Sequence, residues 1–496
     1  MNEREEKLES ELKQANLKIS LLEEKVDALI RLLYVSKSEK VDPNQLTLLE
    51  DVDPKKEEAP VVAEVESGAV IQRSAKQRSP RGPRIPDHLP VHEETLDPAA
   101  VIANPELWRQ VGEEVSEQLD YEPAKFWKRR LVRRKYARKD NPYEAPIIAD
   151  LPASLQDRCL ATPELIAHVV ISKYIDHLPL YRQESIYSRR HGVTIPRQTL
   201  CRWVELAAYW LGSVYEEMIR QQKSCTYLQI DETPIRYLKP GTGKAPQGYF
   251  WVTSIPYGDV VYHWHPGRGA NCIHKIVDEQ FTGALQCDGY RAYPSFKKQR
   301  DAPVELAGCW AHARRKFFEA RARDPVVCDW ILRQIAQLYV IEKALRKHRS
   351  GPSLRAAIRA SESVMTMKRI QKALLILRPR YLPQSTMGKA IGYAFSQWES
   401  LQVFLTNGAV EIDNNLVENA IRPTKLGAKN WLFIGSEDSG RTSAILFSIV
   451  ESAKRHGLEP YAYICDLLNR LPKATNWEVP QLTPAAYAKA QNTKAS

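Results

Sequence analysis

The segment that most constrains the fold is residues 226–238, TYLQIDETPIRYL, because it reads as a buried β-strand with a carboxylate near its centre. Its tyrosine, threonine, isoleucine and leucine content is typical of strands. Asp231 is costly to bury there unless something pairs with it. Two later acidic residues look like its companions, Asp288 in LQCDGY and Glu418 in IDNNLVENAIRP. We expect the three carboxylates to meet and hold divalent metal; the alternative is that each caps a helix or forms a salt bridge.

Strand alternation separates the neighbours of the first aspartate. Successive side chains of a strand point to opposite faces of the sheet, so Asp231 shares a face with Thr233, and Glu232 points away. Asp288 ends a predicted strand just before Gly289. Its side chain is therefore expected to project freely over the sheet edge.

The third motif predicts a helix that carries one carboxylate. Asp413 is a natural N-cap for it. Asn415, Glu418 and Arg422 follow at spacings that place them on one helix face. Pro423 is expected to end or kink the helix. Glu418 is therefore the predicted third ligand, and Asp413 is predicted to be structural.

Three carboxylates at one sheet edge suit Mg²⁺, a hard ion that takes oxygen ligands, with Mn²⁺ as an alternative. Two such ions, roughly 3.5–4 Å apart, can activate a nucleophile and stabilise the leaving oxygen of a phosphoryl displacement. Basic residues near the motifs are expected to hold DNA phosphates: Arg314, Arg315, Lys316, Arg422 and Lys425. Cys309 and His312 have no second ligating pair nearby, so zinc is not favoured there.

The order of elements after residue 223 predicts a multidomain α/β chain with a mixed sheet. Two strands, GYFWVTSIP and DVVYHWHP, follow the first through short connections and predict antiparallel hairpins. A helix, ANCIHKIVDEQF, and two further strands, GALQCDGY and VELAGCWAH, come next. We expect the first part of a catalytic core at 223–324, an all-helical insertion at 325–408, the last part of the core with C-terminal helices at 409–472, and a tail at 473–496.

The N-terminal region predicts a coiled coil within residues 1–45. Apolar residues recur there in alternating steps of four and three, with mostly leucine at d, which favours a parallel dimer over a helix packed on its own domain: Leu8, Leu12, Ala15, Ile19, Leu22, Val26, Leu29 and Leu33. Residues 46–100 read as a flexible linker, acidic and then basic, in which the basic part either contacts DNA phosphates or is merely solvated.

Residues 101–155 predict a small basic domain. Nine lysines and arginines lie between Lys125 and Lys139, interleaved with aromatic residues, and we favour nucleic acid as their partner over a solvated face. The expected contacts are Lys128, Arg129, Arg130, Arg133 and Arg134. Residues 156–222 predict helices, two of them joined by a short glycine-containing turn as in a helix-turn-helix. Arg197 and Arg202 lie where base contacts would be made.

Charge and cysteine content are compatible with an intracellular DNA-binding protein. The formal net charge of +11 is weak evidence alone. The eight cysteines are scattered without a CxxC pair, so neither a disulfide framework nor a zinc ribbon is predicted, and reduced thiols fit the cytosol. No signal peptide or membrane-spanning run is evident. We expect a cytoplasmic protein, nucleoid-associated when bound to DNA.

The motifs together resemble those of the insertion sequence 66 family of bacterial transposases. The matching stretches occur in family order: SKYIDHLPLYRQE, GVTIPRQTLCRWV, DETPIRYL, LQCDGY, GCWAHARRKF, LYVIEKALR, IDNNLVENAIRP, KNWLFIGSEDSG and GLEPYAYICDLL. The resemblance implies a ribonuclease-H-like catalytic domain with a DDE triad on Asp231, Asp288 and Glu418. It implies an enzyme that cuts transposon ends and joins them to target DNA, both double-stranded.

One departure from the family pattern concerns zinc. Family members usually carry a CxxC-type zinc finger before the SKY motif, and this chain has no cysteines there. We therefore expect no structural zinc and assign its place to the basic domain. We also expect a homo-oligomer, at least a dimer, accessory proteins of the same element, and no membrane partner. Two alternatives stay open: a catalytically silent DNA-binding protein derived from a transposase, and a metal-dependent DNA nuclease on the same fold.

Overall fold

The computed structural model describes Asn16, Ile19 and residues 124–136, 147–239, 241 and 243–495. The predicted linker and nearly all of the predicted coiled coil lie outside these residues. So does most of the predicted basic domain. Its described part has no regular secondary structure from 124 to 134. Strand β1 (Lys135–Tyr136) then pairs antiparallel with β2 (Ile147–Ile148).

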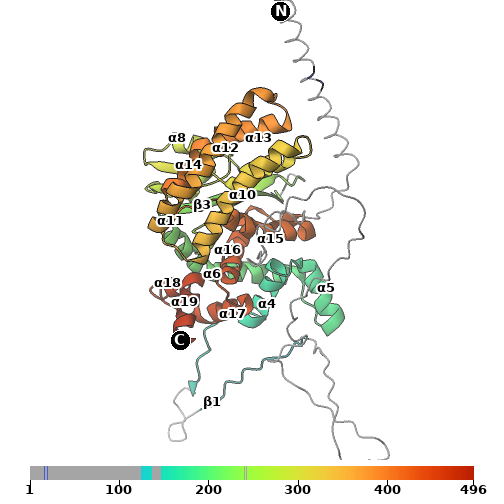
Figure 1. Ribbon diagram of the computed structural model, residues 1–496. Helices are drawn as coiled ribbons and strands as arrows, with labels where there is room; N and C mark the ends of the chain where they lie inside the picture. The colour runs from blue at the N-terminus through green and yellow to red at the C-terminus, as the bar shows by residue number, and fades with distance from the viewer. Residues whose placement is uncertain are drawn as a thin grey trace, which may run out of the picture. The chain divides into compact units, whose positions relative to one another are not determined.

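A six-stranded mixed sheet forms the centre of the fold (Figure 1). Its strands are β3 (Tyr227–Tyr237), β4 (Gln247–Ser254), β5 (Val260–His265), β6 (Gly283–Gln286), β7 (Val304–Ala307) and β8 (Phe433–Ile434). The order is β5-β4-β3-β6-β7, and β8 pairs with the end of β3. The two antiparallel hairpins predicted from the sequence are confirmed, and β6 and β7 add to β3 in parallel. The short strand β8 was not predicted.

Different helices pack against the two faces of β3. Leu228 and Ile230 point into an apolar cluster completed by α7 (Ala270–Ile276) and α8 (Ala292–Lys298). Tyr227, on the opposite face, packs in a second cluster with α9 (Trp310–Ala320) and the helices that follow it. This alternation is the strand period predicted from the sequence. The face that carries Asp231 is therefore the face covered by the helices of the insertion.

Gly283 makes the parallel pairing of β3 and β6 possible. It has a φ of 152°, and a Cβ atom there would lie 2.1 Å from the carbonyl oxygen of Thr226. Gly283→Ala is therefore expected to destabilise the protein by at least about 1–3 kcal/mol, the cost of a strained backbone before the clash is added. Urea unfolding should show this loss, whereas Gly392→Ala, where a Cβ meets open space, should have little effect. Equal stability of both variants would contradict the prediction.

The segment between β7 and α15 is built from helices and contains no strand, as the sequence predicts for 325–408. Its elements are α10 (Pro325–Lys347), α11 (Pro352–Ile358), a π-helical turn (Arg359–Ser363), α12 (Val364–Leu377), a 3₁₀ turn (Arg378–Arg380), α13 (Thr386–Ser396) and α14 (Trp398–Thr406). Helices α10, α12, α13 and α14 lie together as one group in Figure 1.

One fully buried arginine organises that group. Arg359 donates to both carboxylate oxygens of Glu342, at 2.6 and 2.7 Å. It also donates to the carbonyl oxygens of Phe404 at 2.8 Å and Val410 at 3.0 Å. Neither Arg359 nor Glu342 retains any exposed surface. Through this one side chain, the insertion is therefore hydrogen-bonded to the loop that precedes the third acidic motif.

Five helices follow the insertion, and two of them, α15 and α16, pack on strands of the sheet. The five are α15 (Asn415–Trp431), α16 (Glu437–Arg455), α17 (Pro460–Arg470), α18 (Val479–Leu482) and α19 (Pro484–Ala495). Helix α16 packs on β5, and two of its serines accept hydrogen bonds from the strand. The N–H of Val260 donates to Ser452 Oγ at 2.9 Å, and that of Tyr262 donates to Ser448 Oγ at 2.8 Å.

Between residues 147 and 226, three helices precede the first strand of the sheet: α4 (Pro163–Tyr174), α5 (Leu180–His191) and α6 (Arg197–Lys223). Thr162 caps α4, and Gly192, in the glycine-containing turn predicted from the sequence, ends α5 in the left-handed conformation with φ 64°. Helix α6 packs against α4, α5 and α16. Within the described part of the chain, no helix is long and apolar enough to cross a membrane.

Candidate active site

Asp231 lies within β3, and Asp288 lies two residues beyond the end of the neighbouring parallel strand β6. Gln229 of β3 is aligned with Gln286 of β6, and each aspartate follows its glutamine by two residues. The two glutamine side chains bond to each other, Gln229 Nε2 to Gln286 Oε1 at 2.8 Å, so they share a face of the sheet. Because side chains two residues apart in a strand point the same way, Asp231 extends over that face, where the parallel pairing with β6 ends. Asp288 follows the end of β6 and is near enough to act electrostatically on Asp231.

The electrostatics of Asp231 show that negative charges gather around it. Burial raises the pKa of Asp231 well above its ordinary value, and the charges of Glu232, Glu418 and Asp288 raise it further. The N–H of Glu232 donates to Asp231 Oδ1 at 2.9 Å and opposes the rise. All three predicted ligands therefore lie near enough to interact electrostatically. A bound cation would relieve this crowding.

Glu232 belongs to the other face, as the strand period predicts. Its carboxylate accepts from Arg268 at 2.6 Å and from the Tyr293 hydroxyl at 2.8 Å. Burial raises the pKa of Glu232, and the bonds from Tyr293 and Arg268 lower it. The Arg268 guanidinium also stacks 3.9 Å above the ring of Tyr290, two residues after Asp288. This cluster therefore connects the segment around Asp231 to the segment around Asp288, on the face of the sheet opposite Asp231.

A buried network of amide and hydroxyl groups links the sheet to the third motif. Gln286 Oε1 accepts from the Tyr227 hydroxyl at 2.5 Å, and Gln286 Nε2 donates to the carbonyl oxygens of Glu411 at 2.7 Å and Gly308 at 3.1 Å. Gln229 Nε2 donates to the carbonyl oxygen of Asp413 at 3.0 Å. We call Tyr227, Gln229 and Gln286 the polar network. Sequence analysis missed it, although both glutamines stand two residues before an aspartate.

Helix α15 carries Glu418 in its first turn. Asp413 accepts from the backbone N–H of Asn415 at 3.1 Å, which agrees with the predicted capping role, although Asn414 is the N-cap residue itself. The helix does not end at Pro423 but continues to Trp431, so an end at that proline is wrong. Packing explains the continuation, because Thr424 and Gly427 beyond the proline are buried.

Two residues of α9 contact Glu418. His312 Nδ1 lies 3.4 Å from Glu418 Oε1, and Arg315 Nη2 lies 3.6 Å from Oε2. Both side chains come from the GCWAHARRKF motif, which follows strand β7. The predicted phosphate ligand Arg315 therefore reaches the acidic site directly. His312 had been given no role from the sequence.

The other predicted phosphate ligands differ in their surroundings. Arg314 lies beside the ring of Phe318, and Lys316 lies 4.0 Å from Glu319. Arg422 is exposed one helical turn beyond Glu418. Lys425 donates to the carbonyl oxygen of Pro234 at 2.9 Å, which attaches α15 to the end of β3. These cations thus come from the two helices, α9 and α15, that flank the carboxylates.

The predicted DNA contacts outside the core are exposed for the most part. Arg197 and Arg202 project from the start of α6. The basic segment exposes Lys128, Arg129, Arg130 and Arg134, while Arg133 is half-buried and donates to the carbonyl oxygen of Ala149 at 2.8 Å. Neither group of residues approaches the carboxylates through any contact described here.

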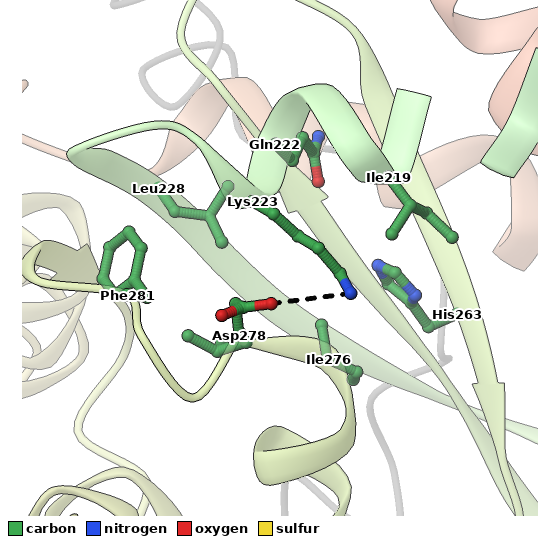
Figure 2. Close-up of a pocket in the computed structure, with 9 residues that line it drawn as sticks. Ile219, Gln222, Lys223, Leu228, His263, Ile276, Asp278 and Phe281 are labelled. Carbon is green, nitrogen blue, oxygen red and sulfur yellow. Dashed lines mark ion pairs between the residues drawn. The ribbon is translucent and has the colours of Figure 1, made fainter. Parts of the chain in front are cut away.

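Two cavities of the described core lie apart from the carboxylates. The larger, about 130 Å³, is lined by Lys173, Cys201, Trp431 and Ser443 among others. Burial lowers the pKa of Lys173 to about 8. The smaller, about 10 Å³, is drawn in Figure 2, where Lys223 pairs with Asp278 at 3.5 Å near His263. None of the three predicted ligands lines either cavity.

His263 beside this smaller cavity makes stability depend on pH. Burial, with a contribution from His265, lowers the pKa of His263 from 6.5 to about 3. Between these values the unfolded chain binds the proton and the folded chain does not. The free energy of unfolding should therefore fall as pH decreases from about 6.5 to 3, by at most about 1.4 kcal/mol per pH unit. In His263→Gln, the free energy of unfolding should fall less with decreasing pH than in the unaltered protein. In His348→Gln, which alters an exposed histidine, it should fall as much as in the unaltered protein. Parallel curves for all three proteins would refute this.

Comparison with known proteins gives the family. The model described as "Transposase IS66 family" matches residues 158–442, "IS66 C-terminal element" matches 448–485, and "Transposase C of IS166 homeodomain" matches 21–93. Two uncharacterized proteins of Sinorhizobium fredii (strain NBRC 101917 / NGR234) are similar. Protein y4jD is 31% identical over 98% of this chain and 100% of its own length. Protein y4qI is 33% identical over 84% of this chain and 81% of its own length. The chain belongs to the IS66 family of transposases.

Proposed function

We propose that the protein cuts the ends of an insertion sequence and joins them to target DNA by metal-dependent phosphoryl transfer, with Asp231, Asp288 and Glu418 as its DDE triad. The observation that carries this proposal is that Asp288 and Glu418 both act electrostatically on Asp231, with each aspartate two residues after one of the aligned glutamines Gln229 and Gln286. Family membership supports the same reaction class, because it implies a DNA-cleaving enzyme.

The three carboxylates fit hard divalent ions. Every proposed ligand atom is an oxygen, which Mg²⁺ and Mn²⁺ prefer. Burial and the charges of Glu232, Glu418 and Asp288 raise the pKa of Asp231, and a bound cation would oppose that rise. Asp231, Asp288 and Glu418 would hold these ions. A pair of ions there supplies nucleophile activation and stabilisation of the leaving oxygen.

The protein's own cations would hold the DNA. Arg315, about half exposed, already contacts Glu418 and would contact a phosphate next to the scissile bond. Arg314, Lys316, Arg422 and Lys425 would hold flanking phosphates. Cations fixed in this way stabilise the charge that develops during displacement and set the register of the duplex.

The remaining architecture supports DNA binding by an oligomer. The strand order β5-β4-β3-β6-β7 supports a ribonuclease-H-like core interrupted by a helical insertion. We assign a helix-turn-helix role to α5 and α6, with Arg197 and Arg202 at the DNA, and a phosphate-binding role to Lys128, Arg129, Arg130, Arg133 and Arg134. The predicted coiled coil at 1–45 would join at least two copies. The match to a homeodomain description over residues 21–93 supports a DNA-binding N-terminal region.

Strand transfer with DNA that carries the element's ends tests the proposal. In Mg²⁺, the variants Asp231→Asn, Asp288→Asn and Glu418→Gln should each lose at least about 100-fold in cleavage and joining, the scale of losing one transition-state stabilising group. The matched control Glu399→Gln changes an exposed acid on α14 and should keep full activity. All four proteins should bind end DNA in a mobility-shift measurement.

The outcomes separate the competing functions. Cleavage that survives all three active-site substitutions would refute the triad. Cleaved products that are never joined would favour a nuclease. DNA binding without cleavage by the unaltered chain would favour a catalytically silent descendant of a transposase.

A further inference from the structure

Cys309, His312 and Glu418 form a second group of potential metal ligands, which shares Glu418 with the three carboxylates. The Sγ atom of Cys309, a ring nitrogen of His312 and a carboxylate oxygen of Glu418 all lie within 4.8 Å of one another. A thiol, an imidazole and a carboxylate in one place are unsuited to Mg²⁺ but are ligands that Zn²⁺ accepts. Nothing in the proposed transposition chemistry uses Cys309 or His312.

The fold holds this group together from both sides. Cys309 is the N-cap residue of α9, and His312 lies in its first turn. Glu418 lies in the first turn of α15. The two segments are joined directly, since the N–H of Trp310 donates to the carbonyl oxygen of Ile412 at 3.1 Å. The polar network holds the same two segments through the carbonyl oxygens of Gly308 and Glu411. The ligand set is therefore built into the core and does not depend on a loop.

Two atoms of the group are buried without hydrogen-bond partners. Among the described residues, neither His312 Nδ1 nor Glu418 Oε1 has such a partner, and the two face each other at 3.4 Å. With the imidazole proton on Nε2, both atoms are acceptors, and a cation between them would satisfy both. Arg315 does not supply it, because it approaches the other oxygen, Oε2.

The spacing suits a tetrahedral ion. Zn–N and Zn–O bonds of about 2.0–2.2 Å place two such ligands about 3.4 Å apart, the distance observed between His312 Nδ1 and Glu418 Oε1. A Zn–S bond of about 2.3 Å requires the thiol to approach by at most about 1 Å. A water molecule would complete the four-coordinate shell.

We propose that Cys309, His312 and Glu418 bind one borderline-soft divalent ion, of the class of Zn²⁺, and that this ion inhibits transposition by removing Glu418 from the Mg²⁺ site. On binding, the Cys309 thiol releases its proton to solvent, and the thiolate bonds the metal. The binding site stands on the geometry alone. The inhibition rests on the proposed function, because it requires Glu418 to be a catalytic ligand.

Cobalt titration of the full chain tests the binding. Co²⁺ replaces Zn²⁺ in such sites and shows a thiolate-to-metal charge-transfer absorption. We expect the unaltered chain to develop this band with one equivalent of Co²⁺ in excess Mg²⁺, and to lose it when Zn²⁺ is added. Cys309→Ser should abolish the band, whereas the matched Cys201→Ser, at an exposed cysteine of α6, should keep it. A band absent from the unaltered chain, or unchanged in Cys309→Ser, would overturn the proposal.

A second variant guards against misfolding of the first. His312→Gln leaves the thiol in place and should weaken Zn²⁺ binding by about 10–100-fold or more, a loss as large as that from altering a ligand's supporting shell. Competition against a chromophoric chelator measures the affinity. An affinity equal to that of the unaltered chain would exclude His312 as a ligand.

Zinc inhibition of strand transfer tests the second half of the proposal. Each protein is compared with its own activity in Mg²⁺ alone, so that changes in basal rate cancel. One equivalent of Zn²⁺ should reduce strand transfer by the unaltered chain and by Cys201→Ser at least about 10-fold, and Cys309→Ser should resist. Equal inhibition of all three would overturn the shared use of Glu418. An unaltered chain that binds Co²⁺ through Cys309 but transfers no strand would overturn the proposed function and leave the metal site standing.

Discussion

Replacing Arg359 with methionine is expected to lower the free energy of unfolding by about 3–5 kcal/mol, because it leaves a buried carboxylate without its main partner. Glu342 would keep only Arg355, whose Nη2 lies 3.3 Å from its Oε2. The carbonyl oxygens of Phe404 and Val410 would also lose their donor. Urea unfolding followed by circular dichroism measures the shift in midpoint. The matched control is Arg369→Met, which alters an exposed arginine of α12 and should cost little.

A second substitution separates the lost charge pair from lost packing. In Arg359→Met with Glu342→Gln, the buried negative charge is gone, so part of the lost stability should return. The double variant should therefore unfold at a higher urea concentration than Arg359→Met alone. If the two variants unfold together, the penalty comes from the carbonyl contacts and the shape of the site, and the charge argument fails.

Gln286→Glu is expected to reduce DNA cleavage by about 10–100-fold although Gln286 is not itself a proposed metal ligand. Glutamate keeps the acceptor that bonds Tyr227 and Gln229 but cannot, when ionised, donate to the carbonyl oxygens of Gly308 and Glu411. Outer groups that orient metal ligands typically contribute on this scale. The segment that leads to Glu418 would lose its attachment to β6.

Hydrogen–deuterium exchange distinguishes this positioning role from general destabilisation. Amides of residues 408–414 should exchange faster in Gln286→Glu, while those of α16 stay protected. The control Gln280→Glu introduces the same charge at an exposed position and should leave both exchange and cleavage unchanged. Reduced cleavage with unaltered exchange at 408–414 would contradict the proposed role of Gln286.

Most strands of the sheet were predicted from local sequence, and the features that were not predicted have physical reasons. Strands β3, β4 and β5 were predicted because their sequences are rich in aromatic and β-branched residues. The short turns between them predicted the antiparallel pairing. Strand β8 has only two residues, Phe433 and Ile434, too few for any period to show. Helix α15 passes through Pro423 because the buried face beyond it outweighs one missing hydrogen bond, a tertiary effect that local rules omit.

Some local features of the candidate site were predictable from the sequence, but the contacts that support it were not. Alternation along β3 correctly separated Asp231 from Glu232, and capping rules correctly gave Asp413 a structural contact. The grouping of the carboxylates as metal ligands remains a prediction. The contacts of Gln286 with Glu411 and of Arg359 with Val410 join segments far apart in the chain, and no local pattern encodes such pairs. The sequence did not favour a metal at Cys309 and His312, because their neighbour in space, Glu418, belongs to another motif.

The serines of α16 that bond to β5 bear on how copies of the protein can associate. An exposed edge strand invites a second chain to extend the sheet, which leads to domain exchange or aggregation. Here the outward amides of Val260 and Tyr262 are already saturated by Ser452 and Ser448, and Ser452 Oγ also donates to the carbonyl oxygen of Val260 at 3.0 Å. At these positions the helix takes the place of a further strand. At Val260 and Tyr262, this edge of the sheet is therefore closed to a strand from a second copy.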